Sequence, residues 1–393
     1  MTHVVVERIR QNAARLAELA PQCEKLGRLT DETARILRET GAMRLLQPPE
    51  YGGYAAHPRD FVEAVTATAA ADPAAGWALG VVGVHPWELA MADPRLREEL
   101  WGGHPDVWIA SPYAVGGLAR RVEGGYALSG RWQFSTATDF CDWVVLGAVV
   151  GDEAGVPGSP PTMLHVVLPR ADYSIIDDSW DTVGLRGTGS KDVVVQDAFV
   201  PDHRTLDAAA AMAGTLAASA GRDETVYRIP FWVMFPLGLT AATIGICEGA
   251  LAAHLDHQRD RVLAVGVKVR DDPYILHAVS EATAEIAASR AHLLANIDSV
   301  FDTLEAGGSI SWEDRAALRR DQIRAAWRAV SAVDEIFARS GGSALRLDQP
   351  LQRYWRDAHA ALNHAIHTTG SVYHAAALSS LEADVPPNLR ILI

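Results

Sequence analysis

Apolar residues recur at every third or fourth position through residues 1–108, which is the spacing of amphipathic helices. The pattern is clearest over residues 5–21 and 29–46, and Thr30 provides a cap-like start for the second segment. A turn-rich stretch, PPEYGGYAAHP, interrupts it at residues 48–58. We therefore predict an N-terminal helical domain over residues 1–108.

From residue 109 to 215 the period shortens to two, as in strands with one buried face. The stretch ARRVEGGYALSGRWQFS alternates around Gly124-Gly125, which is typical of a hairpin. Three β-branched runs follow, at residues 143–150, 163–169 and 191–201. The connections between them are too short for the crossover helices of a doubly wound sheet. We therefore predict a middle β-sandwich or barrel domain over residues 109–215, ending in an Ala-rich loop or short helix.

Helical spacing returns after residue 216. Four long segments carry it, and they predict a four-helix bundle: 236–262, 272–306, 311–341 and 347–368. Residues 229–255 are apolar enough to mimic a membrane span, but Pro230, Pro236 and Glu248 interrupt them, so we expect a buried helix and no membrane. The predicted fold class is α+β, mostly α, with a C-terminal bundle domain over residues 216–393.

The composition is that of an ordinary globular protein, with 49% hydrophobic and 21% charged residues. A net charge of −14 argues against nucleic acid as a partner, because polyanions are bound by clustered Lys and Arg. The three cysteines, Cys23, Cys141 and Cys247, suit neither a disulfide framework nor a CxxC zinc motif, so we expect a reducing cytoplasm. The N-terminal residues lack the apolar core of a signal peptide.

Three histidines, His359, His364 and His367, fall within the segment WRDAHAALNHAIHTTG. On one continuous helix His364 and His367 would lie about 60° apart, and His359 about 140° from His364. No carboxylate follows at ligand spacing, and the chain has no Glu-x-x-His or HExxH, only the reversed His85-Pro-Trp-Glu88. We therefore predict no metal site. A GxSxG elbow and an early GxGxxG motif are absent as well.

Three short segments carry polar groups that could serve a ligand. The loop GLRGTGSKD either turns or holds an anion through backbone N–H groups and hydroxyls, at Gly187, Thr188, Gly189 and Ser190. The strand end WQFSTATDFCDW carries hydroxyls that face solvent or form a shelf for a planar heterocycle, at Ser135, Thr136 and Thr138. His85 and Trp87 lie at a Pro-marked break, where a histidine is more often structural than functional.

Six blocks of the sequence together resemble a known family. They are LLQPPEYGG, GVHPWELA, GGYALSGRWQFS, VGLRGTGSKDVVVQDAFVP, RRDQIRAAWRAV and QRYWRDAHAALNHA. Their order resembles the acyl-CoA dehydrogenase fold, and more closely its flavin-dependent monooxygenase branch, the oxygenase components of two-component aromatic hydroxylases. Within that branch the set is most similar to the enzymes that hydroxylate a phenolic secosteroid in bacterial steroid breakdown.

The resemblance implies a reaction and its partners. Reduced FMN, with FAD as the alternative, would come from a separate NAD(P)H-dependent flavin reductase and react with O₂. The resulting C4a-hydroperoxyflavin would hydroxylate a phenol or related aromatic next to its OH. A phenol attacks best as the phenolate, so a base of near-neutral pKa should contact its OH. The family also implies a homotetramer with flavin sites near subunit contacts.

The resemblance also assigns site residues. The family's base falls on His364, while His85 matches a second pocket histidine. Beyond the resemblance, we expect Trp87, next to His85, and His367, where the chain leaves the family pattern, as further substrate contacts. Ser135 matches a family serine, placed where a hydroxyl near flavin N5 slows the loss of peroxide. The remaining implied cofactor contacts are Trp132, Thr136, Arg261 and the loop Gly187-Thr188-Gly189-Ser190.

Two departures from the family pattern leave the substrate open. The family has Ser-Ser-Gly where this chain has Ser-Thr-Ala at residues 135–137, and Ala-Ala-Asn-Asp-Pro where Ala-Ile-His-Thr-Thr follows His364. A monooxygenase of the same branch acting on sulfur or amine nitrogen is one alternative. An acyl-CoA dehydrogenase is another, although its late Tyr-Glu-Gly-Thr block is missing and only Glu382 lies near the C-terminus. A flavin-binding homologue without catalysis would not need His364.

Overall fold

The computed structural model describes residues 2–151, 162–390 and 393. The predicted N-terminal helices are present, and capping residues explain their ends. Thr30 accepts a hydrogen bond from the Thr33 N–H to begin α2, and the left-handed residues Gly27 and Gly41 end α1 and α2. The helices of this part are α1 (Val4–Leu26), α2 (Asp31–Thr40), α3 (Pro58–Ala71), α4 (Pro73–Val82), α5 (His85–Leu89) and α6 (Pro94–Trp101).

The described strands form one mixed sheet in the order β6-β7-β3-β2-β4-β5-β8, with β1 paired to β4. The predicted hairpin joins β2 to β3 through Gly124, whose φ of +76° suits a tight turn. β1 and β2 run parallel to β4. The strands are β1 (Ile109–Ala110), β2 (Val115–Val122), β3 (Gly125–Ser135), β4 (Trp143–Val150), β5 (Met163–Pro169), β6 (Ser174–Ile176), β7 (Lys191–Pro201) and β8 (Thr205–Asp207).

The C-terminal helices follow two short ones in the Ala-rich segment. Three of the four predicted long helices are present with their ends shifted by a few residues. The helices are α7 (Ala208–Ala213), α8 (Leu216–Ser219), α9 (Phe231–Gln258), α10 (Pro273–Glu305), α11 (Trp312–Ala338), α12 (Pro350–Leu362) and α13 (Gly370–Ser380).

The fourth long helix is shorter than predicted. We expected a helix over residues 347–368, whereas α12 ends at Leu362. A side chain there bonds to a carbonyl that a continuing helix would use for its own backbone. The ring of His367 lies 3.0 Å from the Ala361 carbonyl oxygen. His364 then has an extended backbone in front of a 3-10 turn. His364 and His367 therefore share no helix face, and the predicted separation on one helix is wrong.

Helix α9 runs through the centre of the molecule. Within the described residues it alone has the length and apolar composition of a membrane span, yet 83% of its most apolar window is buried. It crosses α4 so closely that a Cβ on Gly80 would lie 2.7 Å from the carbonyl oxygen of Gly238. Such contact between backbones is typical of a core helix packed against its neighbours.

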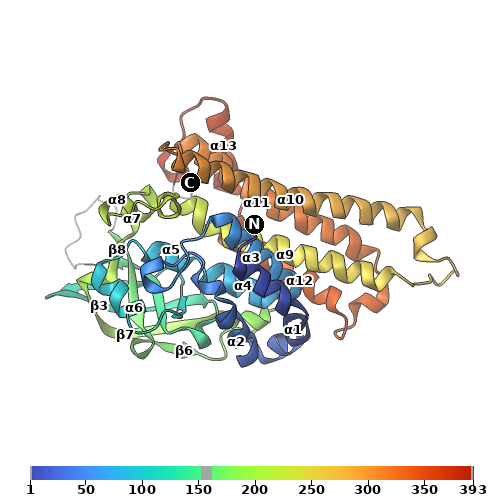
Figure 1. Cartoon of the computed structure of the whole chain (residues 1–393), viewed down its shortest axis with the longest axis horizontal. Helices are drawn as coiled ribbons and strands as arrows, with labels where there is room; N and C mark the ends of the chain where they lie inside the picture. Colours follow the sequence, from blue (N-terminus) through green and yellow to red (C-terminus); the bar gives the residue numbers. More distant parts are fainter. Residues whose placement is uncertain (1, 152–161, 391–392) are drawn as a thin grey trace.

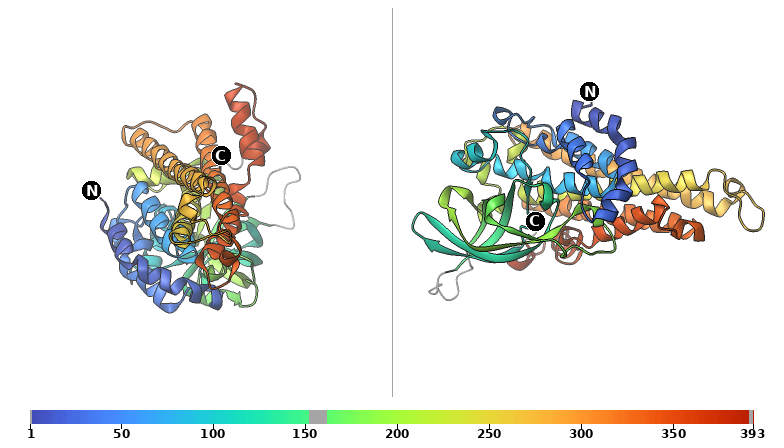
Figure 2. Two further views of the ribbon diagram at one scale, coloured as in Figure 1. Left: turned by 90° about the vertical axis from the view of Figure 1, so that its right-hand side faces the viewer. Right: turned by 90° about the horizontal axis from the view of Figure 1, so that it is seen from below.

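The sheet and the bundle occupy opposite ends of the molecule. Figure 1 shows the strands with α5 and α6 at one end, and α9, α10 and α12 extending to the other. In Figure 2 the turn between α9 and α10 projects farthest from the sheet. Helix α4 lies between the two ends, and one continuous apolar core includes residues from the helices and the sheet. Residues carried by α4 can therefore contact both parts.

Candidate active site

A chain of buried hydroxyl groups joins the end of β3 to the loop before β7. Thr136 Oγ1 lies 2.9 Å from Ser190 Oγ, which lies 2.7 Å from Thr188 Oγ1. The backbone adds a link, because the Ala137 N–H donates to the Thr188 carbonyl over 2.9 Å. The structure therefore brings together two segments that the sequence marked separately.

The loop before β7 is less open than its sequence suggests. The N–H groups of Thr188 and Gly189 donate to carbonyls of the same loop. Gly187 packs so tightly against α1 and α4 that an added Cβ would lie 2.8 Å from Cys23 Cβ and 2.9 Å from Ala74 Cβ. The expectation of exposed N–H groups at Thr188 and Gly189 is therefore wrong, and the loop contributes buried hydroxyls instead.

Two unusual residues end β3. Ser135 is fully buried, and its Oγ has no hydrogen-bond partner among the described residues. Phe134 has a left-handed φ of +68°, and its side chain is 61% exposed beside Trp180. A buried hydroxyl without a partner and a strained, exposed aromatic residue both cost stability. Such features are typical of a position where a ligand is bound.

His85 begins α5 and is fully buried. Its Nδ1 lies 2.5 Å from the Ile109 carbonyl oxygen, which can only accept, so Nδ1 carries the proton. Its Nε2 is then an acceptor, 2.6 Å from Ser111 Oγ. Burial lowers the pKa of His85 to about 4, against the opposing effects of the Ile109 carbonyl and Glu88. Ser111 therefore donates to a neutral imidazole and keeps lone pairs for another donor.

His364 caps the turn that follows α12. Its Nδ1 accepts a hydrogen bond from the Ile366 N–H over 3.3 Å, and its ring meets Trp77 of α4 edge-on, with centroids 5.8 Å apart. Part of the residue reaches solvent, but the surrounding atoms desolvate the ring and, with the positive charge of Arg319, lower its pKa to about 4. Neither His364 nor His85 has the near-neutral pKa that we expected of the base.

Known proteins resemble this chain over its whole length. The family described as "Acyl-CoA dehydrogenase, C-terminal domain" matches residues 237–369. A "Pigment production hydroxylase" of Rhodococcus erythropolis is 52% identical over 393 residues, which is 100% of each protein. The oxygenase subunit HsaA of a flavin-dependent monooxygenase from Rhodococcus jostii is 41% identical over 360 residues, 91% of this chain and 93% of that protein. The chain belongs to the oxygenase components of flavin-dependent monooxygenases.

Solved structures and a further relative agree with this oxygenase family. The crystal structure of 3-HSA hydroxylase from Rhodococcus sp. RHA1 has a TM-score of 0.92 and 38% identity over 99% of each chain. XiaF from Streptomyces sp., in complex with FADH2 and glycerol, has a TM-score of 0.91 and 25% identity over 97% of this chain and 96% of that one. The oxygenase component of an FADH(2)-dependent resorcinol hydroxylase from Rhizobium is 31% identical over 89% of each protein. The expected acyl-CoA dehydrogenase-like fold and the enzyme class are confirmed.

The end of β3 fits the flavin of such an oxygenase. A flavin offers a flat ring system, which suits the exposed side chain of Phe134, and polar ring atoms, which suit the unpartnered Oγ of Ser135. Ala137 has a left-handed φ of 55° and is buried at the turn that leads away from both. A glycine, as in the family pattern, would adopt this conformation without strain. This chain adopts it with the additional methyl group of Ala137.

Two of the expected cofactor contacts have their polar groups engaged within the protein. Trp132 is 1% exposed, and its indole N–H donates to the Gly147 carbonyl over 2.7 Å inside the sheet. The indole N–H of Trp132 is thus used inside the sheet, and the expected contact between Trp132 and the cofactor stays a prediction. Arg261 lies just beyond α9, where its Nη1 donates to Gln258 Oε1 and to the Ser340 carbonyl. Figure 1 shows this turn at the end of the bundle remote from the sheet, so Arg261 cannot reach the β3 end of its own chain.

Trp87 and His367, the expected substrate contacts besides His85, are buried with their polar atoms in use. The indole N–H of Trp87 donates to the Val226 carbonyl over 2.8 Å. The ring of His367 bonds to the Ala361 carbonyl over 3.0 Å and lies 3.4 Å from Thr240 Oγ1. Both side chains are thus fixed by protein contacts, which favours packing over a polar contact with substrate.

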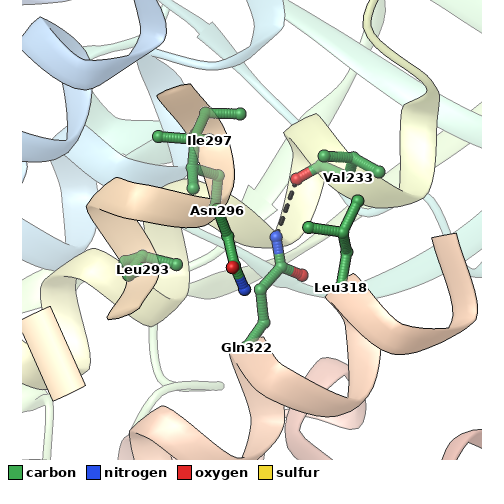
Figure 3. A pocket seen from close by; sticks show the side chains of 7 residues that line it. Val233, Leu293, Asn296, Ile297, Leu318 and Gln322 are labelled. Carbon is green, nitrogen blue, oxygen red and sulfur yellow. Dashed lines mark hydrogen bonds between the residues drawn. The ribbon is translucent and has the colours of Figure 1, made fainter. Parts of the chain in front are cut away.

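A small cavity lies among α9, α10 and α11. Its volume is about 10 Å³, room for roughly one water molecule and far too little for an aromatic ring. Figure 3 shows Gln322 directed toward α9, where its Nε2 donates to the Val233 carbonyl over 2.9 Å. Gln322 Oε1 in turn accepts from Arg319, which is buried and also donates to the Ile366 carbonyl. This cavity therefore belongs to the support of the turn after His364 and is not the substrate site.

Sequence reasoning missed two residues of the site. Ser111 stands in the ordinary segment WIASPYA, and its partner His85 is 26 positions away. Only the packing of β1 beside α5 brings the two together. The sequence shows Phe134 as an aromatic residue next to Ser135. Strand alternation gave no reason to choose Phe134 over Trp132 as a ligand contact.

Proposed function

We propose that this chain hydroxylates a phenolic substrate next to its OH, using O₂ and reduced flavin supplied by a separate NAD(P)H-dependent flavin reductase. When bound, reduced FMN or FAD supplies the activated oxygen atom that enters the ring. The relatives that are named as hydroxylases, among them the resorcinol hydroxylase, support this reaction class. The resemblance to the secosteroid enzymes makes a steroid-derived phenol the first substrate to test.

The observation that carries the proposal is the pair His85 and Ser111. The Ser111 hydroxyl donates to His85 Nε2 and can accept a hydrogen bond from a phenol. When the phenol proton passes to Ser111 Oγ, the serine proton passes to His85 Nε2. The phenol becomes the more nucleophilic phenolate, and Ser111 returns to its starting state. This pair is sealed from water, which protects the reacting oxygen from side reactions.

His364 is the second candidate for the base. Its Nδ1 is used by the Ile366 N–H, which leaves Nε2 for a ligand, and Trp77 fixes the ring from α4. Because Nδ1 accepts, the neutral imidazole carries its proton on Nε2 and donates there; it accepts a phenol proton at Nε2 only in the other tautomer, which gives up the hydrogen bond from the Ile366 N–H. We propose that His364 holds the substrate or its oxygen donor on the side opposite His85.

We further propose a division of the remaining residues. Ser135 and Phe134 contact the flavin ring, while the hydroxyl chain and the close-packed glycines before β7 shape the pocket around it, at Thr136, Gly187, Thr188, Gly189 and Ser190. The chain assembles as a homotetramer in the cytoplasm, and Arg261 holds the flavin phosphate of a neighbouring copy. We also propose domain limits at residues 108 and 215; the described strands run from Ile109 to Asp207, inside these limits.

Coupled turnover tests the function. Reduced FMN from an unrelated flavin reductase is supplied with O₂ and a panel of phenols, and hydroxylated product is compared with O₂ consumed. Ser111→Ala is expected to lower product formation by about 10²-fold while O₂ is still consumed, because the phenol stays protonated. His364→Asn is the matched variant for the second histidine. If only His364→Asn abolishes product, the base is His364.

Two results would change the reaction class. Oxidation of a thioether or an amine, with no product from any phenol, would move the enzyme to sulfur or nitrogen chemistry. Bleaching of the oxidised flavin by a CoA ester without O₂ would indicate a dehydrogenase.

A further inference from the structure

A buried carboxylate stands one helical turn after His85. Glu88 is 1% exposed, and its Oε1 accepts a hydrogen bond from His165 Nδ1 over 2.6 Å. Its other oxygen accepts a short hydrogen bond from the Tyr113 hydroxyl. The three side chains come from α5, β5 and the segment after β1, so the fold has assembled them from distant parts of the sequence. From the sequence, we considered the motif His85-Pro-Trp-Glu88 only as a metal site, and it does not fit one.

Glu88 is held as an anion. Burial alone would raise its pKa, but the interaction with His165 and the hydrogen bonds from His165 and Tyr113 hold the pKa below its ordinary value. Burial and the adjacent carboxylate raise the pKa of Tyr113 well above its usual range, so its hydroxyl remains a donor. A desolvated carboxylate is costly to keep, and full hydrogen bonding of its oxygens offsets part of that cost.

This carboxylate lies beside the proton acceptor of the site. The ring of Tyr113 packs edge-on against His85, with centroids 5.6 Å apart, and against His165, with centroids 4.6 Å apart. The charged and titratable groups that act on His85 are Glu88, which favours its cation, and His165, which disfavours it. The acceptance of a proton by His85 creates a positive charge in a buried site next to the negative phenolate, and a second nearby anion stabilises that charge further.

We propose that Glu88 is a positioning residue that balances the positive charge of His85 while this imidazole holds the proton of the phenol. The inference rests on the proposed function, because it needs the transfer through Ser111. In that transfer the phenol O–H bond breaks and an N–H bond forms at His85 Nε2, while Nδ1 keeps its proton on the Ile109 carbonyl. The net charge of phenol and imidazole together stays zero. Tyr113 and His165 hold the carboxylate in place through their hydrogen bonds.

A coloured phenol tests the proposal without turnover. 4-Nitrophenol absorbs visible light only as the phenolate, so a titration of the complex with the purified chain reports the ionised fraction of the bound phenol. In the wild-type chain this fraction is expected to stay constant as the pH falls below the pKa of free nitrophenol, because the proton remains on His85. Glu88→Gln keeps the size of the side chain and one of its two accepted hydrogen bonds but removes its charge. The constant fraction is then expected to fall by about tenfold or more.

Matched variants separate charge balance from packing. His165→Gln removes the group that disfavours the His85 cation and keeps a donor for Glu88, so the ionised fraction should not fall. Glu248→Gln removes a half-buried carboxylate that pairs with Arg290 over 3.1 Å, and it should leave the fraction unchanged. Thermal unfolding confirms that each variant is folded.

The outcomes divide cleanly. An equal ionised fraction in the wild-type chain and Glu88→Gln, with a loss in His85→Asn, overturns the role of Glu88 and leaves the proton transfer standing. Equal losses in Glu88→Gln and His165→Gln assign the cluster to packing alone. A wild-type chain that does not ionise bound nitrophenol, or ionises it equally after His85→Asn, overturns the transfer itself and the inference with it.

Discussion

Asp357 is a single buried carboxyl group that holds the start of the loop before β7. Its Oδ1 accepts a hydrogen bond from the Leu185 N–H over 2.6 Å, and Leu185 has a left-handed φ of 53°. The turn that follows carries Thr188, whose hydroxyl donates to the Leu185 carbonyl over 2.8 Å. Burial raises the pKa of Asp357 to about 7. One side chain on α12 therefore holds a strained residue at the start of the loop.

Asp357→Asn should change how stability depends on pH. A carboxyl group whose pKa rises on folding contributes stability that is fully present below its unfolded pKa, about 4, and is lost as the pH rises through about 7. Asn accepts the same hydrogen bond without titrating. Relative to the wild-type chain, the variant should therefore gain free energy of unfolding between about pH 4 and pH 8, by at most about 4 kcal/mol. Urea unfolding across this range measures it, and a pH-independent difference would show that Asp357 does not titrate.

At the scale of elements, α4 joins the two halves of the site. Its Ala74 contacts the loop before β7 at Gly187, and its Trp77 contacts His364. The helix then leads through Gly83 and Val84 into α5, which carries His85. The close crossing at Gly80 fixes α4 against α9. Helix α4 therefore holds the loop before β7, His364 and His85 in fixed positions relative to one another.

Gly187→Ala should disturb the packing of the loop before β7 against α1 and α4. The new Cβ would meet side chains of two buried helices, which cannot withdraw, so the loop and its hydroxyls must move. We expect about 1–3 kcal/mol of lost stability and a weaker affinity for FMN, measured by fluorescence titration. Gly124→Ala is the control, because it adds strain at φ +76° with no atom within 4 Å and lies in the distant hairpin. Equal FMN affinities in both variants would contradict the role of the loop.

The same scale shows what the sequence could and could not predict. Periodicity was enough for the hairpin and the long helices, because one face of each is buried. It failed at the end of α12, where the His367 ring competes for a helix carbonyl. Regular strand alternation would put Trp132 and Phe134 on one face, whereas the left-handed φ of Phe134 and an irregular register turn only Phe134 outward. The pairing of Ser111 with His85 depends on tertiary packing and has no local pattern.

At the scale of the whole molecule, the projecting end of the bundle exposes several large apolar side chains to solvent. Val265 and Tyr274 are each 80% exposed, and Leu347 is 82% exposed. Arg261 joins the α9–α10 turn to the segment before α12 through the Ser340 carbonyl. Single exposed apolar residues are ordinary, but several on one projecting end are typical of a protein contact. A second copy of this chain would cover them and bring Arg261 toward a flavin site.

Val265→Asp combined with Leu347→Asp should therefore give a smaller particle in light scattering, because charges at a contact oppose its burial. The affinity for FMN should fall in the same variant, although neither residue lies near β3. Unchanged mass would show that this end is not a contact. Reduced mass with unchanged FMN affinity would show that each chain builds its flavin site alone.

Mixing two defective chains decides whether the site is shared. Ser135→Ala impairs the contact with the flavin ring, and Arg261→Gln impairs the proposed contact with the phosphate of a neighbour's flavin. If one copy supplies Ser135 and another supplies Arg261, random assembly of equal amounts restores about a quarter of the sites, since each half is intact in half of the chains. Coupled product formation should then exceed that of either variant alone. Arg270→Gln, an exposed position in the same turn, is the control and should couple normally by itself. A mixture no better than its components would place Arg261 outside the site.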